Sequence, residues 1–99
     1  MAKYTLTATG STDGFELNGS SNVTMVYTLT GVSGTVVVKA EGTQDGSTWV
    51  NLDENGTTSI TSDGSYGFEK SEVCYSQVRF TWISGTATSI VVSMLKNSG

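Results

Sequence analysis

The stretch VTMVYTL at residues 23–29 decides the fold class of this chain. Large apolar side chains stand at every second position from Val23 to Leu29, and threonine occupies two of the three positions between them. Successive side chains of a β-strand point to opposite faces of its sheet, whereas a helix repeats its apolar positions every three or four residues. The stretch therefore predicts a β-strand with one buried face.

Glycine-containing turns separate further strands of this kind along the chain. The strongest turn signal is Asp45-Gly46, because both central residues of a type I′ hairpin turn need a positive φ angle, which glycine adopts without steric cost. We therefore expect a positive φ at Gly46. Other turn signals lie at residues 11–14, 31–34, 55–56 and 63–64.

This spacing predicts an all-β protein, an antiparallel β-sandwich (jelly-roll or Ig-like) of about eight or nine short strands. The expected strands are residues 3–9, 15–17, 23–29, 36–41, 48–52, 58–61, 66–68, 77–83 and 89–95. The first of them is expected at a sheet edge. With 99 residues the chain is expected to form a single domain, residues 1–99, in which 96–99 are a loose tail.

The alternation also predicts which side chains fill the core. Trp49 is included because it follows the hairpin turn and continues the strand alternation. The predicted core is Leu6, Met25, Tyr27, Val36, Val38, Trp49, Leu52, Phe68, Val78, Phe80, Trp82, Ile90 and Val92.

Composition excludes several classes of function. The net charge is −4 and the five cations are scattered along the sequence, so neither nucleic acid nor an anionic membrane surface is an expected partner. Histidine is absent and Cys74 is the single cysteine, which excludes a histidine-based triad, an internal disulfide and a cysteine zinc site. The N-terminus lacks the apolar stretch of a secretory signal, and synthesis in a cytoplasm is expected.

The carboxylates do not form a convincing catalytic or metal site. Asp45 and Asp63 each precede a glycine, which is typical of turn chemistry rather than of a glycosidase pair. The run Asp53-Glu54-Asn55 offers oxygen ligands for calcium but lacks EF-hand spacing. We expect no enzymatic activity, no metal and no cofactor.

Several strands carry apolar residues on both faces. In residues 89–95, Ile90, Val92 and Met94 oppose Val91 and Leu95. A sandwich buries only one face of each sheet, so the second face indicates a partner or a homo-oligomer, a dimer or a trimer. The candidate interface residues are Val37, Ile83, Val91 and Leu95.

One family resemblance adds a function. The hairpin DGSTWVNL at residues 45–52, the later strand Val78-Arg79-Phe80 and the turn SGTAT at residues 84–88 follow one another as in small virion proteins of tailed bacteriophages. The chain resembles them over roughly residues 34–95. The resemblance implies a head decoration (cement) protein, made in the host cytoplasm and located on the capsid surface of the virion. It implies the major capsid protein as the partner and no catalytic residues.

A second interpretation stays open. The chain could be a carbohydrate-binding or adhesion module of a phage tail or head fibre, which would use exposed aromatic side chains as sugar platforms. The exposure of Trp49 and Trp82 distinguishes the two interpretations, because buried tryptophans cannot bind a sugar.

Overall fold

The computed structural model describes residues 2–18, 20–52, 56–71, 73 and 75–97. These residues form ten β-strands and no helix. The strands are β1 (Ala2–Leu6), β2 (Gly10–Ser11), β3 (Phe15–Glu16), β4 (Asn22–Thr30), β5 (Ser33–Thr43), β6 (Val50–Asn51), β7 (Thr58–Ile60), β8 (Gly64–Lys70), β9 (Gln77–Thr86) and β10 (Ser89–Asn97).

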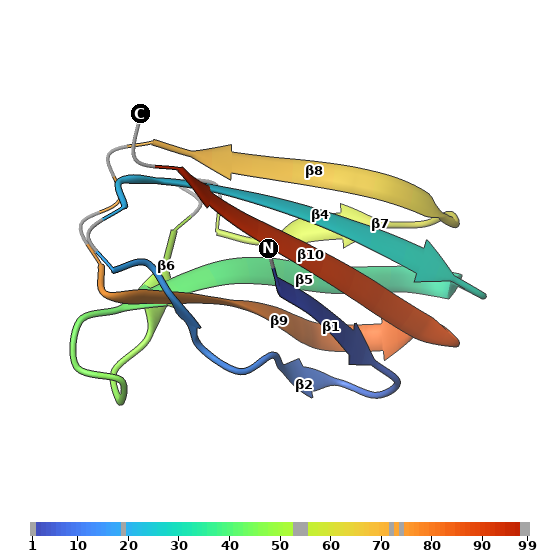
Figure 1. Cartoon of the computed structure of the whole chain (residues 1–99). Helices are drawn as coiled ribbons and strands as arrows, with labels where there is room; N and C mark the ends of the chain where they lie inside the picture. The colour runs from blue at the N-terminus through green and yellow to red at the C-terminus, as the bar shows by residue number, and fades with distance from the viewer. Residues whose placement is uncertain (1, 19, 53–55, 72, 74, 98–99) are drawn as a thin grey trace.

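The strands build two antiparallel sheets that face each other as a sandwich (Figure 1). The four-stranded sheet has the order β1-β10-β4-β8. In the six-stranded sheet β9 and β5 are the central pair, with β2 and β3 beside β9 and β6 and β7 beside β5. The all-β sandwich that the alternation predicts is confirmed.

The core lies between the sheets and is filled by alternate residues of the long strands. From β4 it takes Val23, Met25, Tyr27 and Leu29, which are at most 5% exposed. Tyr27 packs its ring against Phe80 of the opposite sheet, with 4.8 Å between the ring centroids. Ten of the predicted core residues are buried, namely Met25, Tyr27, Val36, Val38, Leu52, Val78, Phe80, Trp82, Ile90 and Val92.

Three predicted core residues are not fully buried. Leu6 and Phe68 lie on edge strands and are only partly buried, packed against the core. For Trp49 the prediction is wrong. Asn51 pairs with Glu41 on the outer face of the six-stranded sheet, and alternation places Trp49 on the same outer side.

The strand predictions differ from the structure mainly at the ends. β1 lies at a sheet edge as expected but ends at Leu6, and the chain then crosses to the other sheet to form β2, which the pattern does not predict. The sequence predicts a loose tail at 96–99; residues 96 and 97 instead continue β10, and 98–99 lie outside the described residues. The Lys96 ammonium donates a hydrogen bond to the Glu16 carbonyl at 3.1 Å.

The loop at Asp45-Gly46 agrees with the sequence prediction only in part. Asp45 does not have the positive φ of a type I′ turn, and residues 44–49 separate β5 from β6, so the connection is not a two-residue hairpin. Gly46 has φ 82°, which confirms the expected positive angle. The Asp45 carboxylate accepts hydrogen bonds from the backbone N–H groups of Ser47 and Thr48, both at 2.8 Å. The β5–β6 loop is thus closed by its own aspartate.

Candidate binding surfaces

The outer face of the four-stranded sheet carries a small apolar patch, formed by Val26, Val91 and Leu95. Val26 and Leu95 are 43% and 51% exposed, and Val91 is half-buried. Val91 pairs with Thr28 and Leu95 with Thr24, so both lie diagonally beside Val26. The three side chains therefore lie close together on the outer face of β10 and β4, with Ser93 directly opposite Val26 and between the other two.

Hydroxyl groups surround the apolar patch. Thr28 and Ser65 share a hydrogen bond of 2.8 Å between their side chains. Thr5 stands opposite Val91 on the β1 side. Charge is confined to the margins of this face, at Lys3 and Glu69 on the two edge strands. Such a face suits contact with an apolar or weakly polar partner.

The predicted interface residues do not form one surface. Val91 and Leu95 belong to the apolar patch, whereas Val37 and Ile83 lie on the six-stranded sheet. Val37 is half-buried and Ile83 is 41% exposed, next to a register shift between β5 and β9. Val26, which the sequence analysis did not select, joins the patch because β4 and β10 are neighbours. Strand order carries that information, and periodicity does not.

A buried carboxylate organises the outer face of the six-stranded sheet. Glu41 is 4% exposed and accepts hydrogen bonds from Arg79 at 3.0 Å and Thr81 at 2.6 Å, and its other oxygen lies 3.3 Å from the Lys39 ammonium. Burial raises the pKa of the Glu41 carboxyl, but the hydrogen bonds from Thr81, Arg79 and Lys39 outweigh burial and hold it below its ordinary value. Glu41 is thus ionised, paired and already occupied.

Trp49 completes this cluster. The Arg79 guanidinium lies over the Trp49 ring, 4.1 Å from its centroid, as a cation–π contact. The ring is half-buried, and Arg79 covers one of its faces. Trp82 is 2% exposed in the core. The exposed large apolar residues of the described chain are aliphatic: Val26, Val50, Ile83 and Leu95.

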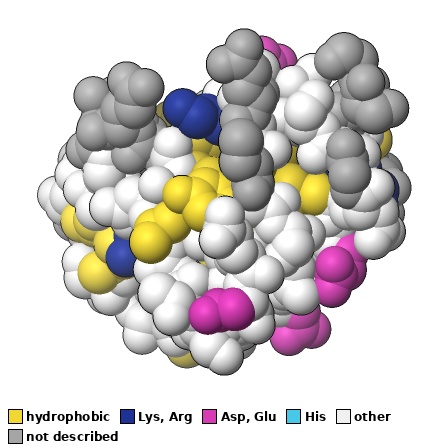
Figure 2. Space-filling model, turned by 90° about the vertical axis from the view of Figure 1, so that its left-hand side faces the viewer, with side chains coloured by type: hydrophobic (Ala, Val, Ile, Leu, Met, Phe, Trp, Pro, Cys, Tyr) yellow, Lys and Arg dark blue, Asp and Glu magenta, His cyan; other side chains and the backbone are white. Residues whose placement is uncertain are grey.

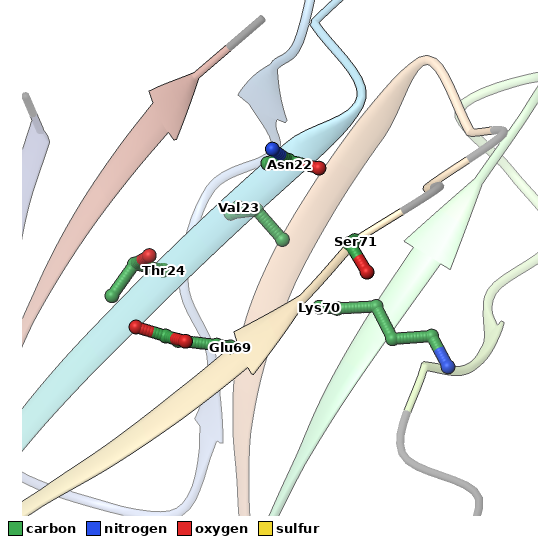
Figure 3. Close-up of a pocket in the computed structure, with 6 residues that line it drawn as sticks. All are labelled: Asn22, Val23, Thr24, Glu69, Lys70 and Ser71. Carbon is green, nitrogen blue, oxygen red and sulfur yellow. The ribbon is translucent and has the colours of Figure 1, made fainter. Parts of the chain in front are cut away.

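Two hollows of the described surface are open and shallow. One of about 340 Å³ lies at one end of β4 and β8, where Thr24 and Glu69 point the same way and Lys70 points away from them (Figure 3). Another of about 430 Å³ lies beside the β5–β6 loop and is lined by Tyr75 and Asp45 among others. Figure 2 shows hydrophobic side chains in a band across the end of the sandwich that carries this loop, with most of the visible acidic side chains below the band.

Metal-binding groups do not gather in the described part of the chain. There, no group of three or more acidic, histidine or cysteine side chains could hold a metal ion. The oxygen-rich run at 53–55 and Cys74 lie outside the described residues. Within the described ranges we also find no helix with the length and apolar character needed to cross a membrane.

Comparison with known proteins gives structural neighbours only. No family model matches the sequence, and no curated protein matches it. The crystal structure of the SPBc2 prophage-derived protein YomS aligns with a TM-score of 0.64 and 13% identity, covering 97% of this chain and 94% of that chain. A CBM4 structure, of the carbohydrate-binding module class, aligns with a TM-score of 0.53 and 13% identity, covering 96% of this chain. A protein of the disulfide-linked pili of Bacillus endospore appendages aligns with a TM-score of 0.48 and 12% identity, covering 98% of this chain and 87% of that chain.

These likenesses concern the fold. YomS is matched over nearly its whole length, whereas this chain spans 61% of the CBM4 chain. At 13% identity the likeness to YomS shows a shared fold. The finer assignments, decoration of a capsid or binding of a carbohydrate, are treated below as proposals.

Proposed function

We propose that this chain is a structural protein of a phage virion that binds the outer surface of the assembled capsid and stabilises it. The observation that carries the proposal is the apolar patch Val26, Val91 and Leu95, exposed on a face that the sandwich itself leaves uncovered. The fold likeness to a prophage-derived protein along nearly the full length of both chains supports it. The partner is the major capsid protein, and no catalytic role is proposed.

The mechanism of stabilisation is mass action. A protein that binds the assembled shell but not its separate subunits stabilises the shell by RT ln(1 + [L]/Kd), about 2.7 kcal/mol per site at a hundredfold excess over Kd. A shell offers many equivalent sites, so modest affinity at each site is sufficient. A small apolar patch framed by hydroxyls fits such repeated, weak contacts.

The second candidate function is carbohydrate binding. The likeness to a CBM4 structure and the half-exposed ring of Trp49 favour it. Against it, Arg79 already occupies one face of that ring, and Trp82 lies in the core. A sugar would have to stack on the remaining face or displace the guanidinium.

The proposal is tested by co-sedimentation of the purified protein with expanded capsids of the phage that encodes it. Leu95→Asp is expected to reduce binding strongly, because it forces a charge into an apolar contact. Its unfolding midpoint should stay close to that of the wild type, since Leu95 is 51% exposed in the free protein. Ile83→Asp is the matched control, a similar change at a residue 41% exposed on the other sheet.

Three results would contradict the proposal. Absence of capsid binding by the wild type would remove it. Loss of binding in Ile83→Asp but not in Leu95→Asp would move the contact to the six-stranded sheet. The wild type could instead bind a glycan array and not bind capsids, and Trp49→Ala could abolish the glycan binding. That result would replace the proposal by the carbohydrate-binding candidate.

A further inference from the structure

The sheet edges of this sandwich differ in how well they are protected. The six-stranded sheet ends in short pieces: β2, β3 and β6 have two residues each and β7 has three. In the other sheet β1 has five residues. Short edge strands are a common way in which proteins prevent further strands from adding.

β8 lacks this protection. It has seven residues, contains no proline, and pairs with β4 in one unbroken register from Gly64 to Lys70. It is the terminal strand of its sheet, and its other edge pairs with no described strand. Every second residue of β8 therefore directs its backbone N–H and C=O groups away from β4. A further strand could form hydrogen bonds with these groups.

We propose that the β8 edge pairs with the β8 edge of a second copy of this chain, giving a two-fold dimer with one continuous eight-stranded sheet. A two-fold axis perpendicular to the sheet keeps the outer faces of both copies on the same side. Residues that lie directly opposite each other must point to the same face of the sheet. This condition is met only if the axis passes between a residue and the same residue of the second copy. The register is thus restricted to residue-centred pairings.

Centring the axis on Gly67 pairs all seven residues of both strands, whereas each neighbouring residue-centred register pairs two fewer. In this register Tyr66 lies opposite Phe68 of the second copy, and the arrangement occurs twice. Aromatic pairs of this kind are favourable across antiparallel strands. The Tyr66 ring is already held in place, because its hydroxyl donates to the Ser62 carbonyl at 2.8 Å and its ring stacks on Tyr27 at 5.9 Å.

The other pairs in this register fit as well. Ser65 lies opposite Glu69 of the second copy, a hydroxyl donor facing a carboxylate acceptor on the outer face. Gly64 lies opposite Lys70, so no two like charges meet. At the axis itself stand two glycines, and a Cβ built on Gly67 meets nothing within 4 Å. The edge is self-complementary in shape and in charge.

The dimer would bring two apolar patches to one side. Val26 pairs directly with Gly67, so the two Val26 side chains would stand three strand spacings apart, roughly 14 Å. A bivalent surface gains avidity without new contacts at either patch. The inference does not depend on the capsid proposal, because self-association is measured with the purified protein alone.

A cysteine at the axis tests the register. In Gly67→Cys, made in a Cys74→Ser background, the two thiols would face each other at the 4.5–5.5 Å Cα separation of an antiparallel pair, within the range of a disulfide. Mild oxidation should give a covalent species of twice the 10.4 kDa chain mass on a non-reducing gel. The parent Cys74→Ser protein is the background control.

Two further variants separate this register from others. Ser65→Cys alone and Glu69→Cys alone should not cross-link. In each case the thiol would lie roughly 13 Å from the equivalent thiol of the second copy. An equal mixture of the two variants should cross-link. Cross-linking of either single variant, or failure of the mixture, would overturn the Gly67-centred register.

Sedimentation velocity over a wide concentration range tests the dimer without a cross-link. Pairing of one strand buries little area, so a reversible monomer–dimer equilibrium is expected. Gly67→Lys places two ammonium groups at the axis and should raise the dimer dissociation constant roughly fivefold, whereas Gly67→Ser should change it little. A wild type that stays monomeric at all concentrations, or one that forms open-ended chains through β1, would refute the proposal.

Discussion

Trp82 and Trp49 occupy opposite faces of the six-stranded sheet and illustrate how a single residue's surroundings set its energetic weight. The Trp82 indole lies between the sheets and donates its N–H to the Ser84 carbonyl at 3.1 Å, so both its apolar body and its polar group are satisfied. The Trp49 ring is half-buried against Arg79. Chemically identical side chains should therefore respond differently to truncation.

Trp82→Ala is expected to cost about 3–5 kcal/mol of unfolding free energy, because it leaves a large cavity in the core. Trp49→Ala should reduce the free energy of unfolding by less, about 1–2 kcal/mol. It removes the cation–π contact with Arg79 on the outer face and a side chain that is only partly buried. Denaturant unfolding monitored by circular dichroism measures both. Equal losses would show that the two rings contribute alike and that the assigned faces are wrong.

Gly85 and Gly46 separate backbone strain from lack of space. Both have a positive φ, 96° and 82°. A Cβ on Gly46 meets nothing within 4 Å, whereas a Cβ on Gly85 collides with the backbone of Thr35 and Val36. The tight β5–β9 contact thus depends on the missing side chain at Gly85.

Gly46→Ala should cost about 1–2 kcal/mol, the strain of a left-handed alanine. Gly85→Ala should cost that amount plus about 1–3 kcal/mol for overpacking against backbone that cannot move aside cheaply. Thermal or urea unfolding of the two variants provides the comparison. A Gly85→Ala protein as stable as Gly46→Ala would contradict the close approach of β5 and β9.

Side-chain direction was the part of the site that periodicity could predict. Alternation correctly assigns the inward positions Val78, Phe80 and Trp82, because β9 is long and regular there. It fails at Trp49, where the residues before β6 belong to a loop and the phase of the alternation depends on the pairing of Asn51 with Glu41. A two-residue strand is too short for its pattern to fix its own phase.

At the level of elements, one aspartate connects two loops. The Asp63 carboxylate, before β8, accepts hydrogen bonds from the backbone N–H groups of Val32 at 2.7 Å and Gly31 at 3.0 Å in the β4–β5 turn. These bonds hold the pKa of the Asp63 carboxyl below its ordinary value. The turn that joins the two sheets is thereby tied to the start of the edge strand.

The folded-state pKa of Asp63 is lowered, so its contribution to stability is present above the unfolded-state pKa and lost as pH falls through the folded-state value. Asp63→Asn should be less stable than the wild type at neutral pH. The difference in unfolding free energy between the two should shrink as pH falls below the ordinary aspartate value of 3.8. Urea unfolding at pH 7 and at pH 3 measures it. A difference that is independent of pH would show that the carboxylate charge does not matter.

The sequence predicts the strands better than it predicts their partners. Nine of the ten strands overlap a predicted strand, and β2 is missed because its two residues carry no apolar pattern. Which strands share a sheet depends on long-range pairing, such as β1 with β10, that periodicity within a strand does not encode. For that reason periodicity does not indicate that the candidate interface residues lie on two different sheets.

At the scale of the whole molecule, the two outer faces have opposite character. The four-stranded sheet presents the apolar patch, and the six-stranded sheet presents the ionic cluster around Glu41. Only 14% of the residues are charged. A contact through the outer face of the four-stranded sheet should therefore be insensitive to ionic strength. A contact through the outer face of the six-stranded sheet should weaken as ionic strength rises.

Capsid binding is accordingly expected to survive about 0.5 M salt, where interactions between exposed charges are largely screened. Co-sedimentation at low and high salt measures it, with Leu95→Asp as the reference for lost binding. Release of the wild type from capsids at high salt would show that charged groups make the contact and that the apolar patch does not.

The pairing of β1 with β10 has a mechanical consequence. Ala2 lies opposite Met94, so the first and last strands begin and end at the same end of one antiparallel ladder. A force that draws the two chain ends apart would load the Ala2–Met94 contacts first and then each following pair in turn. The hydrogen-bonded pairs of β1 and β10 would then break one after another instead of bearing the force together. The sandwich should therefore unfold at a lower force when it is pulled by its two chain ends than when it is pulled through β4 and β8.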